Sequence, residues 1–324
     1  MSHGFEDWEV SGEAQPRQVD YAFDLERVLS SVVALHARVP PDAFTAGVLG
    51  MERVGNGVLI REDGVVLTIG YLVTEADHVE LTTHDGRSVP GHVLGFDHHT
   101  GFGLVQALEP LGVPVMPLGD SKTLVVGERV IVGGAGGRTH SVAARVVARE
   151  EFAGYWEYVL DNAIFTRPAH PVWSGSALIG PRGDLLGIGS LHVQQRAPGG
   201  AASLNMMVPI ELLAPIYEDL LKGRTEQPGR PWLGLFAQEL EGTVVIIGVT
   251  SDGPAKRAGL REGDIVLAVA GEEINGLADF YRSIWSLGPA GVEVPLMLDR
   301  EGDVFEVRVT SRDRRSYLKS ARYH

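Results

Sequence analysis

Histidine is the residue type in this chain best suited to bind a metal or transfer a proton at neutral pH, since its pKa lies near 6.5. The chain has eleven histidines and no cysteines. Five histidines fall between residues 78 and 99: His78, His84, His92, His98 and His99. Apart from the adjacent pair, their spacings of six to eight residues form no compact ligand motif, and no thiolate can complete a zinc site. We expect solvated loop histidines, no metal and no cofactor.

The absence of cysteine also excludes disulfides and thiolate catalysis. The formal net charge of -14 argues against nucleic-acid binding, which needs clustered Lys and Arg. The first ten residues are acidic where an export signal needs positive charge, and no later stretch is apolar enough to span a membrane. The sequence as given predicts a cytoplasmic protein without a membrane span, or a periplasmic one if an export signal was removed.

Short apolar runs rich in Val, Ile and Leu follow one another from residue 25 to about residue 190, separated by glycine-containing turns. This pattern is typical of a β-barrel or β-sandwich. Residues 209–221 have apolar side chains at helical spacing, with Pro209 in the first turn and Gly223 as a C-cap, so a helix is expected there. A second helix is expected over residues 277–287.

Three stretches of this β-rich region resemble the HtrA family of serine proteases. They are residues 31–33 with 49–60, residues 118–121 with 126–128, and residues 183–188. A fourth stretch, residues 253–266, resembles the PDZ domain of the same family, with Gly259 and Gly263 where tight turns need a residue without a Cβ. The resemblance covers about residues 30–310.

The resemblance implies a mostly β protein, a chymotrypsin-like double β-barrel followed by a PDZ domain built as a β-sandwich with a helix. The implied division is an N-terminal arm (1–24), a trypsin-like domain (25–222), a linker (223–230), a PDZ domain (231–312) and a tail (313–324). The linker is polar and contains Pro and Gly.

Catalysis in this family needs His, Asp and Ser in that chain order. The resemblance places Tyr71 at the His position and Gly101 at the Asp position. A phenol with a pKa near 10 is no substitute for imidazole as a base at neutral pH, and glycine has no side chain to orient one.

The nucleophile position is Ser174, and the resemblance assigns the oxyanion hole to the backbone N–H groups of Val172 and Ser174. The family has glycine where this chain has Val172, and a β-branched residue adopts unusual backbone angles poorly. Loss of Ser or His alone from a triad costs about 10⁶-fold in turnover. We therefore expect Ser174 to be retained without catalytic use, in a pseudoprotease.

A base from elsewhere in the chain is the alternative, which would make the protein an active serine endopeptidase. His98 and His99 lie near the vacated Asp position, and His170 and His192 flank the nucleophile segment. We expect these histidines to be ordinary loop residues.

The PDZ-like half has the residues for peptide binding. PDZ domains add a peptide C-terminus to a sheet edge and hold its carboxylate with backbone N–H groups. The resemblance places this loop at Leu233, Gly234 and Leu235, and helix residues Tyr281 and Ile284 either line a pocket for the last side chain or belong to the core. Expected partners are polypeptide C-termini or other proteins.

Two further expectations concern assembly and an alternative function. The family usually forms trimers through N-terminal aromatic residues, which here are Phe5, Trp8, Tyr21 and Phe23. A scaffold whose PDZ-like domain binds no peptide is a third functional alternative.

Overall fold

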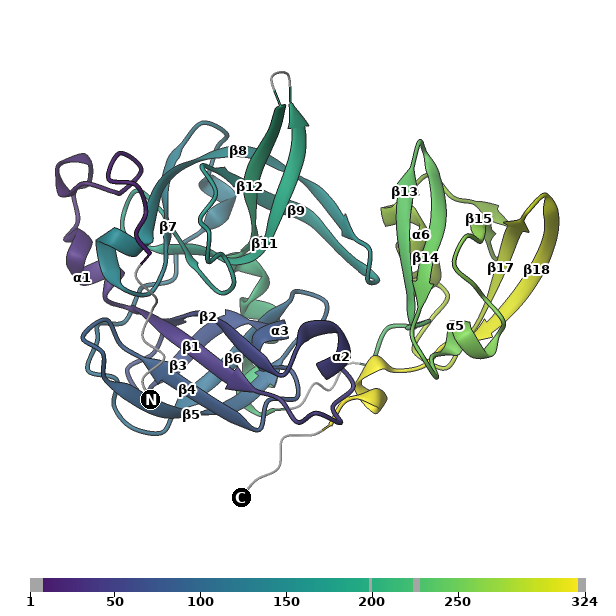
Figure 1. The fold of residues 1–324 in the computed structure, drawn as a ribbon, viewed down its shortest axis with the longest axis horizontal. Coiled ribbons are helices and arrows are strands. Elements are labelled where there is room, and N and C mark those ends of the chain that lie inside the picture. The colour runs from purple at the N-terminus through teal and green to yellow at the C-terminus, as the bar shows by residue number, and fades with distance from the viewer. Residues whose placement is uncertain (1–7, 198–199, 224–227, 320–324) are drawn as a thin grey trace. The chain divides into compact units, whose positions relative to one another are not determined.

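The computed structural model describes residues 8–197, 200–223 and 228–319 (Figure 1). The chain forms two compact units. Of the described residues, the first contains 8–150, 162–197, 200–223 and 319, and the second contains 151–161 and 228–318. Within the described ranges, no helix combines the length and apolar character needed to cross a membrane.

The first β-barrel of the first unit is closed in the strand order β1-β2-β3-β6-β5-β4, with every neighbouring pair antiparallel. Its strands are rich in β-branched and aliphatic residues, which suit a pleated surface with one buried face. The strands are β1 (Val32–Arg38), β2 (Glu52–Leu59), β3 (Val65–Ile69), β4 (His78–Thr82), β5 (Ser88–Phe96) and β6 (Phe102–Ala107). A single helical turn, α3 (Gly70–Val73), follows β3 and carries Tyr71.

The second β-barrel is closed in the order β10-β11-β12-β9-β8-β7. Valine, isoleucine and leucine side chains fill its interior, among them Val130, Ile164 and Leu178. Its strands are β7 (Arg129–Gly133), β8 (Ser141–Gly154), β9 (Tyr158–Arg167), β10 (Ala177–Ile179), β11 (Leu185–Ala197) and β12 (Gly200–Pro209). The connection from β9 to β10 carries Ser174.

The remaining helices of the first unit are short. They are α1 (Leu25–Leu29), α2 (Ala46–Leu49) and α4 (Tyr217–Leu221), with 3-10 turns at Gln18–Asp20, Ser121–Thr123, Gly137–His140, Ile210–Leu212 and Ala214–Ile216. The continuous helix expected over residues 209–221 is therefore wrong. Pro215 lies inside that segment and has no backbone N–H to donate, so only the last five residues form an α-helix.

The arm aromatics within the described range pack against their own unit. The Trp8 ring meets the rings of His140 and His170 edge-on, with centroids 4.8 Å and 5.6 Å apart. Tyr21 and Phe23 contact each other at 5.3 Å. Phe5, the fourth aromatic expected in a trimer contact, lies outside the described residues. The trimer stays a prediction.

The second unit contains an antiparallel sheet in the order β13-β14-β15-β17-β18, so β13 is an edge strand. Its strands are β13 (Leu235–Leu240), β14 (Thr243–Val249), β15 (Ile265–Val269), β16 (Glu272–Glu273), β17 (Glu293–Arg300) and β18 (Asp303–Thr310), with β16 paired to β15. Its helices are α5 (Pro254–Arg257), α6 (Leu277–Ser286) and the 3-10 turn Arg314–Tyr317. The helix expected over residues 277–287 is present as α6.

The second unit also includes the end of the β8–β9 hairpin, residues 151–161. The expected domain limits, 25–222 and 231–312, assign this hairpin to the first domain. They remain a prediction, and the compact units differ from them at this hairpin and at the two ends of the second domain. The expected fold class, two barrels followed by a PDZ-type sheet with a helix, is confirmed.

Candidate functional site

The Ser174 segment is held in place by the buried side chain of Asn56 on β2. The Asn56 amide nitrogen donates to the carbonyl oxygens of Val172 at 3.0 Å and Ser174 at 3.1 Å. The Asn56 side-chain oxygen accepts from the Ala135 backbone N–H at 2.9 Å, and its backbone N–H donates to the Ser174 carbonyl at 2.8 Å. One side chain therefore joins strand β2 of the first barrel to two segments of the second.

Gly175 allows this close approach. Its φ of +72° lies in the left-handed region, and a Cβ at this position would lie 1.9 Å from the Asn56 carbonyl oxygen. Only glycine fits between Ser174 and the first barrel without moving the backbone.

The Ser174 hydroxyl is paired with the phenol of Tyr71. The Tyr71 hydroxyl oxygen lies 2.7 Å from Ser174 Oγ and 2.8 Å from the Ser190 carbonyl oxygen. Burial raises the pKa of Tyr71 to about 12, so the phenol is neutral at physiological pH. The structure thus brings together the residues predicted at the His and Ser positions, and the residue at the predicted His position is a neutral phenol.

The residue predicted at the Asp position, Gly101, serves the backbone alone. Its carbonyl oxygen accepts from the Gly70 N–H at 2.6 Å, one residue before Tyr71, and its φ is +87°. The nearby Asp97 carboxylate accepts from the Thr100 N–H at 2.7 Å, within its own loop.

The backbone N–H of Val172, one of the two predicted for the oxyanion hole, already donates a hydrogen bond within the chain. The Val172 N–H donates to Nδ1 of His170 at 3.0 Å, and Nε2 of His170 donates to the His140 carbonyl at 2.7 Å. Burial lowers the pKa of His170 below its ordinary value, so the ring is neutral and its two nitrogens are both engaged. The amides of Val172 and Ser174 do not form a free pair of donors in this structure.

The other histidines considered as substitute bases do not serve Ser174. The His192 ring packs against Trp173, with centroids 5.3 Å apart. His98 contacts Phe96 edge-on, and His99 lies 3.9 Å from the Asp97 carboxylate. Across residues 8–197, 200–223 and 228–319, no imidazole hydrogen-bonds the Ser174 hydroxyl.

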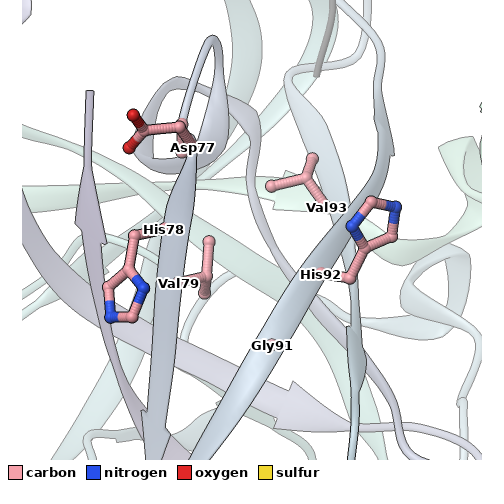
Figure 2. A pocket seen from close by; sticks show the side chains of 7 residues that line it. Asp77, His78, Val79, Gly91, His92 and Val93 are labelled. Atoms are coloured by element: carbon pink, nitrogen blue, oxygen red, sulfur yellow. The ribbon is translucent and has the colours of Figure 1, made fainter. Parts of the chain in front are cut away.

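Two of the histidines weighed as metal ligands line a shallow hollow between β4 and β5. Figure 2 shows His78 and His92 on opposite sides of it, with Asp77 near its end. No group of three His, Cys, Asp or Glu side chains in the described part of the chain is arranged to hold a metal ion.

The predicted carboxylate loop of the second unit holds a carboxylate. The backbone N–H groups of Leu233, Gly234 and Leu235 all donate to the side chain of Glu157, at 3.0 Å, 2.8 Å and 3.2 Å. Gly234 has a φ of +72°, which turns three consecutive amides toward one acceptor. The loop therefore has the geometry for capturing a carboxylate.

The helix residues predicted to line the pocket, Tyr281 and Ile284, are fully buried in the core of the second unit. Val159 of the hairpin belongs to the same buried cluster. Burial and the neighbouring Glu157 raise the pKa of Tyr281 far above its ordinary value, so its phenol is neutral.

Sequence reasoning did not identify Asn56 or Glu157 as functional residues, and it considered His170 only as a base. A glutamate in a hairpin turn carries no local signal of its partner, because the loop it serves lies more than seventy residues away in the chain. The asparagine lies within a motif noted for its resemblance, and its polar side chain in a buried strand was the available signal.

Two known protein families match this chain, each over a different part of it. Residues 55–188 match the trypsin-like peptidase domain and residues 231–310 match the PDZ domain. The fold and these matches define a trypsin-fold chain with a C-terminal PDZ domain.

Among individual proteins, the chain is similar to DegP-like proteins described as probable periplasmic serine endoproteases. That of Halomonas elongata is 29% identical over 280 residues, covering 80% of this chain and 56% of the relative. That of Chlamydia pneumoniae is 25% identical over 274 residues, covering 79% and 54%. The chain thus spans about half the length of the curated relatives it matches. The cytoplasmic location expected for the sequence as given stays a prediction.

Solved structures show the same fold. The serine endoprotease from Yersinia pestis aligns with a TM-score of 0.52 and 22% identity, over 89% of this chain and 96% of that one. The HtrA-type protease AlgW with a decapeptide aligns with a TM-score of 0.52 and 20% identity, over 90% and 97%.

Proposed function

We propose that this chain is a catalytically inactive relative of HtrA-type proteases. The observation that carries the proposal is the 2.7 Å contact between the Tyr71 hydroxyl and Ser174 Oγ. A serine nucleophile must pass its proton to a base during attack, and a neutral phenol with a raised pKa cannot accept it.

The surroundings of Ser174 support the same conclusion. Gly101 supplies no carboxylate to orient a base, and the Val172 N–H is paired with His170. Removing a single oxyanion donor costs about 10²–10³-fold in turnover, in addition to the loss of the base. An active endopeptidase with a relocated base would need a histidine at the Ser174 hydroxyl.

The function we infer is binding of polypeptide C-termini or partner proteins through the PDZ domain. The loop at residues 233–235 has three converging N–H groups and lies next to β13, an edge strand of the sheet, and these are the two elements such recognition needs. Assembly as a trimer through the N-terminal arm is part of the proposal.

Cleavage and binding are tested on the same preparation. We expect no cleavage of casein above the Ser174→Ala variant, because that substitution removes a hydroxyl with no base. Peptides with a free C-terminal carboxylate are expected to bind, and their amidated forms are not. Cleavage that disappears in the Ser174→Ala variant would contradict the proposal.

A structural scaffold that binds no peptide is the second candidate function. The observation that favours it is the Glu157 carboxylate already seated on the loop. The two candidates differ in whether that carboxylate can be displaced.

A further inference from the structure

The turn between β8 and β9 presents a carboxylate to the PDZ loop of the second unit. Glu157 lies in this turn with a φ of +61°, a conformation that costs a non-glycine residue about 1 kcal/mol or more. The three N–H groups of residues 233–235 converge on its side chain. A hydrogen bond contributes about 0.5–1.5 kcal/mol, so three of them offset the strained backbone.

The same turn also pairs with the edge strand next to the loop. The backbone N–H of Ala237, on β13, donates to the Tyr155 carbonyl oxygen at 2.9 Å. The Tyr155 ring packs near Phe236, with centroids 6.0 Å apart. A backbone hydrogen bond to the edge strand and a carboxyl group on the loop, the two components of C-terminal peptide recognition, are thus both supplied by residues 155–157.

Contacts on either side of the turn hold it there. Val159, which is 9% exposed, is buried in one cluster with Tyr281 and Ile284 of α6. Arg282 of the same helix forms ion pairs with Glu151, at 2.6 Å, and with Asp161. Val159, two residues after Glu157, therefore contributes an aliphatic side chain to the apolar cluster under α6.

We propose that residues 155–157 are an internal ligand of the PDZ domain, which an external peptide with a free C-terminal carboxylate must displace. The inference rests on the proposed function and deepens it, because it names what occupies the peptide site. Because the aliphatic side chain of Val159 packs in the apolar cluster under α6, we choose a small aliphatic residue as the last residue of the external peptide.

Competition of this kind lowers the apparent affinity for any external ligand. A tethered segment acts at an effective concentration of about millimolar, and only the fraction of molecules with an empty site binds peptide. Removing the Glu157 carboxylate is therefore expected to raise the apparent affinity at least about tenfold.

The test uses the full chain, the Glu157→Ala variant and a matched Glu150→Ala control. Glu150 is an exposed carboxylate on β8, the strand that leads into the turn. The probe is a pool of fluorescein-labelled heptapeptides that end in Val with a free carboxylate, compared with the same pool amidated. Amide hydrogen exchange at Leu233, Gly234, Leu235 and Ala237 is followed in parallel.

The expected result is faster exchange at these four amides in Glu157→Ala alone, with the rest of the unit still protected. The carboxylate pool should bind this variant at least about tenfold more tightly, and the amidated pool should not. Faster exchange without peptide binding would support the internal ligand while contradicting the proposed function. Equal binding to all three proteins with unchanged exchange would overturn the inference and leave the proposed function standing. Neither binding nor a change in exchange would overturn both.

Discussion

At the scale of single residues, the proposal depends on the contact between the Tyr71 phenol and the Ser174 hydroxyl. The Ser190 carbonyl oxygen can only accept, so a phenol proton is required when Tyr71 pairs with it. With a pKa of about 12, almost none of the phenol is ionised at neutral pH. We therefore propose that Tyr71 stabilises the segment around Ser174 and does not act as its base.

Replacing Tyr71 with Phe tests this stabilising role. We expect a loss of about 1–3 kcal/mol in the free energy of unfolding, because the Ser190 carbonyl and the Ser174 hydroxyl lose a partner. Urea denaturation measures the change. The control is Tyr21→Phe, since the Tyr21 hydroxyl makes no hydrogen bond with the described residues, and its effect should stay within about 0.5 kcal/mol. Equal effects of both substitutions would show that the Tyr71 contacts contribute nothing.

The raised pKa of Glu157 leads us to expect that the free energy of unfolding depends on pH. Burial raises its pKa to about 7 from an ordinary value of 4.5, against the lowering effect of the three N–H groups and of Arg314, while the Tyr281 phenol faces it uncharged. The folded chain therefore binds more protons than the unfolded chain between these values. The Glu157→Gln variant does not titrate at this position. The free energy of unfolding of the wild-type chain, relative to this variant, should therefore fall by at most about 3 kcal/mol as the pH rises from about 4.5 to 7.

Denaturant unfolding of the wild-type chain and Glu157→Gln at pH 5 and pH 7.5 measures this difference. A difference that stays constant, or that grows with pH, would contradict a raised pKa. The comparison with the Gln variant cancels the titration of all other groups.

The roles of single residues were predictable only where an aligned motif supplied them. The motifs predicted the contact between the Tyr71 and Ser174 positions, while the catalytic roles assigned to Tyr71, Gly101 and Ser174 stay predictions. The bond between the Val172 N–H and His170 depends on how the chain turns between β9 and β10, which residue types alone do not specify. The sequence argument against an oxyanion hole rests on the β-branched side chain of Val172. The structure adds a different observation, because the Val172 N–H donates a hydrogen bond to His170.

At the scale of elements, Asn56 connects strand β2 to the nucleophile segment. Its side chain is 1% exposed and makes three hydrogen bonds, to Ala135, Val172 and Ser174. Buried polar groups left without partners each cost about 1–3 kcal/mol. The barrels thus share a polar contact at the point where the Ser174 segment is held.

Asn56→Ala should therefore lower the free energy of unfolding by about 2–4 kcal/mol. The matched control is Asn162→Ala on β9, an exposed strand position where the change should stay within about 0.5 kcal/mol. Chemical denaturation of both variants measures the effect. A loss below 1 kcal/mol at Asn56 would show that water replaces these bonds.

Elements with a strong local pattern were predictable from the sequence, and those shaped by distant contacts were not. α6 follows from its apolar spacing and the preceding Gly276, whose φ is +97°. The segment at residues 209–221 has a similar spacing, but Pro215 prevents one continuous helix. The occupation of the loop at residues 233–235 depends on a hairpin far away in the chain, so no local pattern indicates it.

At the scale of the whole molecule, a protease-type fold is combined with an intact peptide-binding fold. The first part has two closed barrels and places the Tyr71 phenol against the hydroxyl of Ser174. The second part retains the carboxylate loop, the edge strand and the helix.

The most direct test of the account is the reaction of Ser174 with a fluorophosphonate, followed by intact mass. We predict no adduct on the wild-type chain after prolonged incubation at neutral pH, as for Ser174→Ala, because no base activates the hydroxyl. An active trypsin-fold protease serves as the positive control. Stoichiometric labelling of the wild-type chain that is absent from Ser174→Ala would contradict the account.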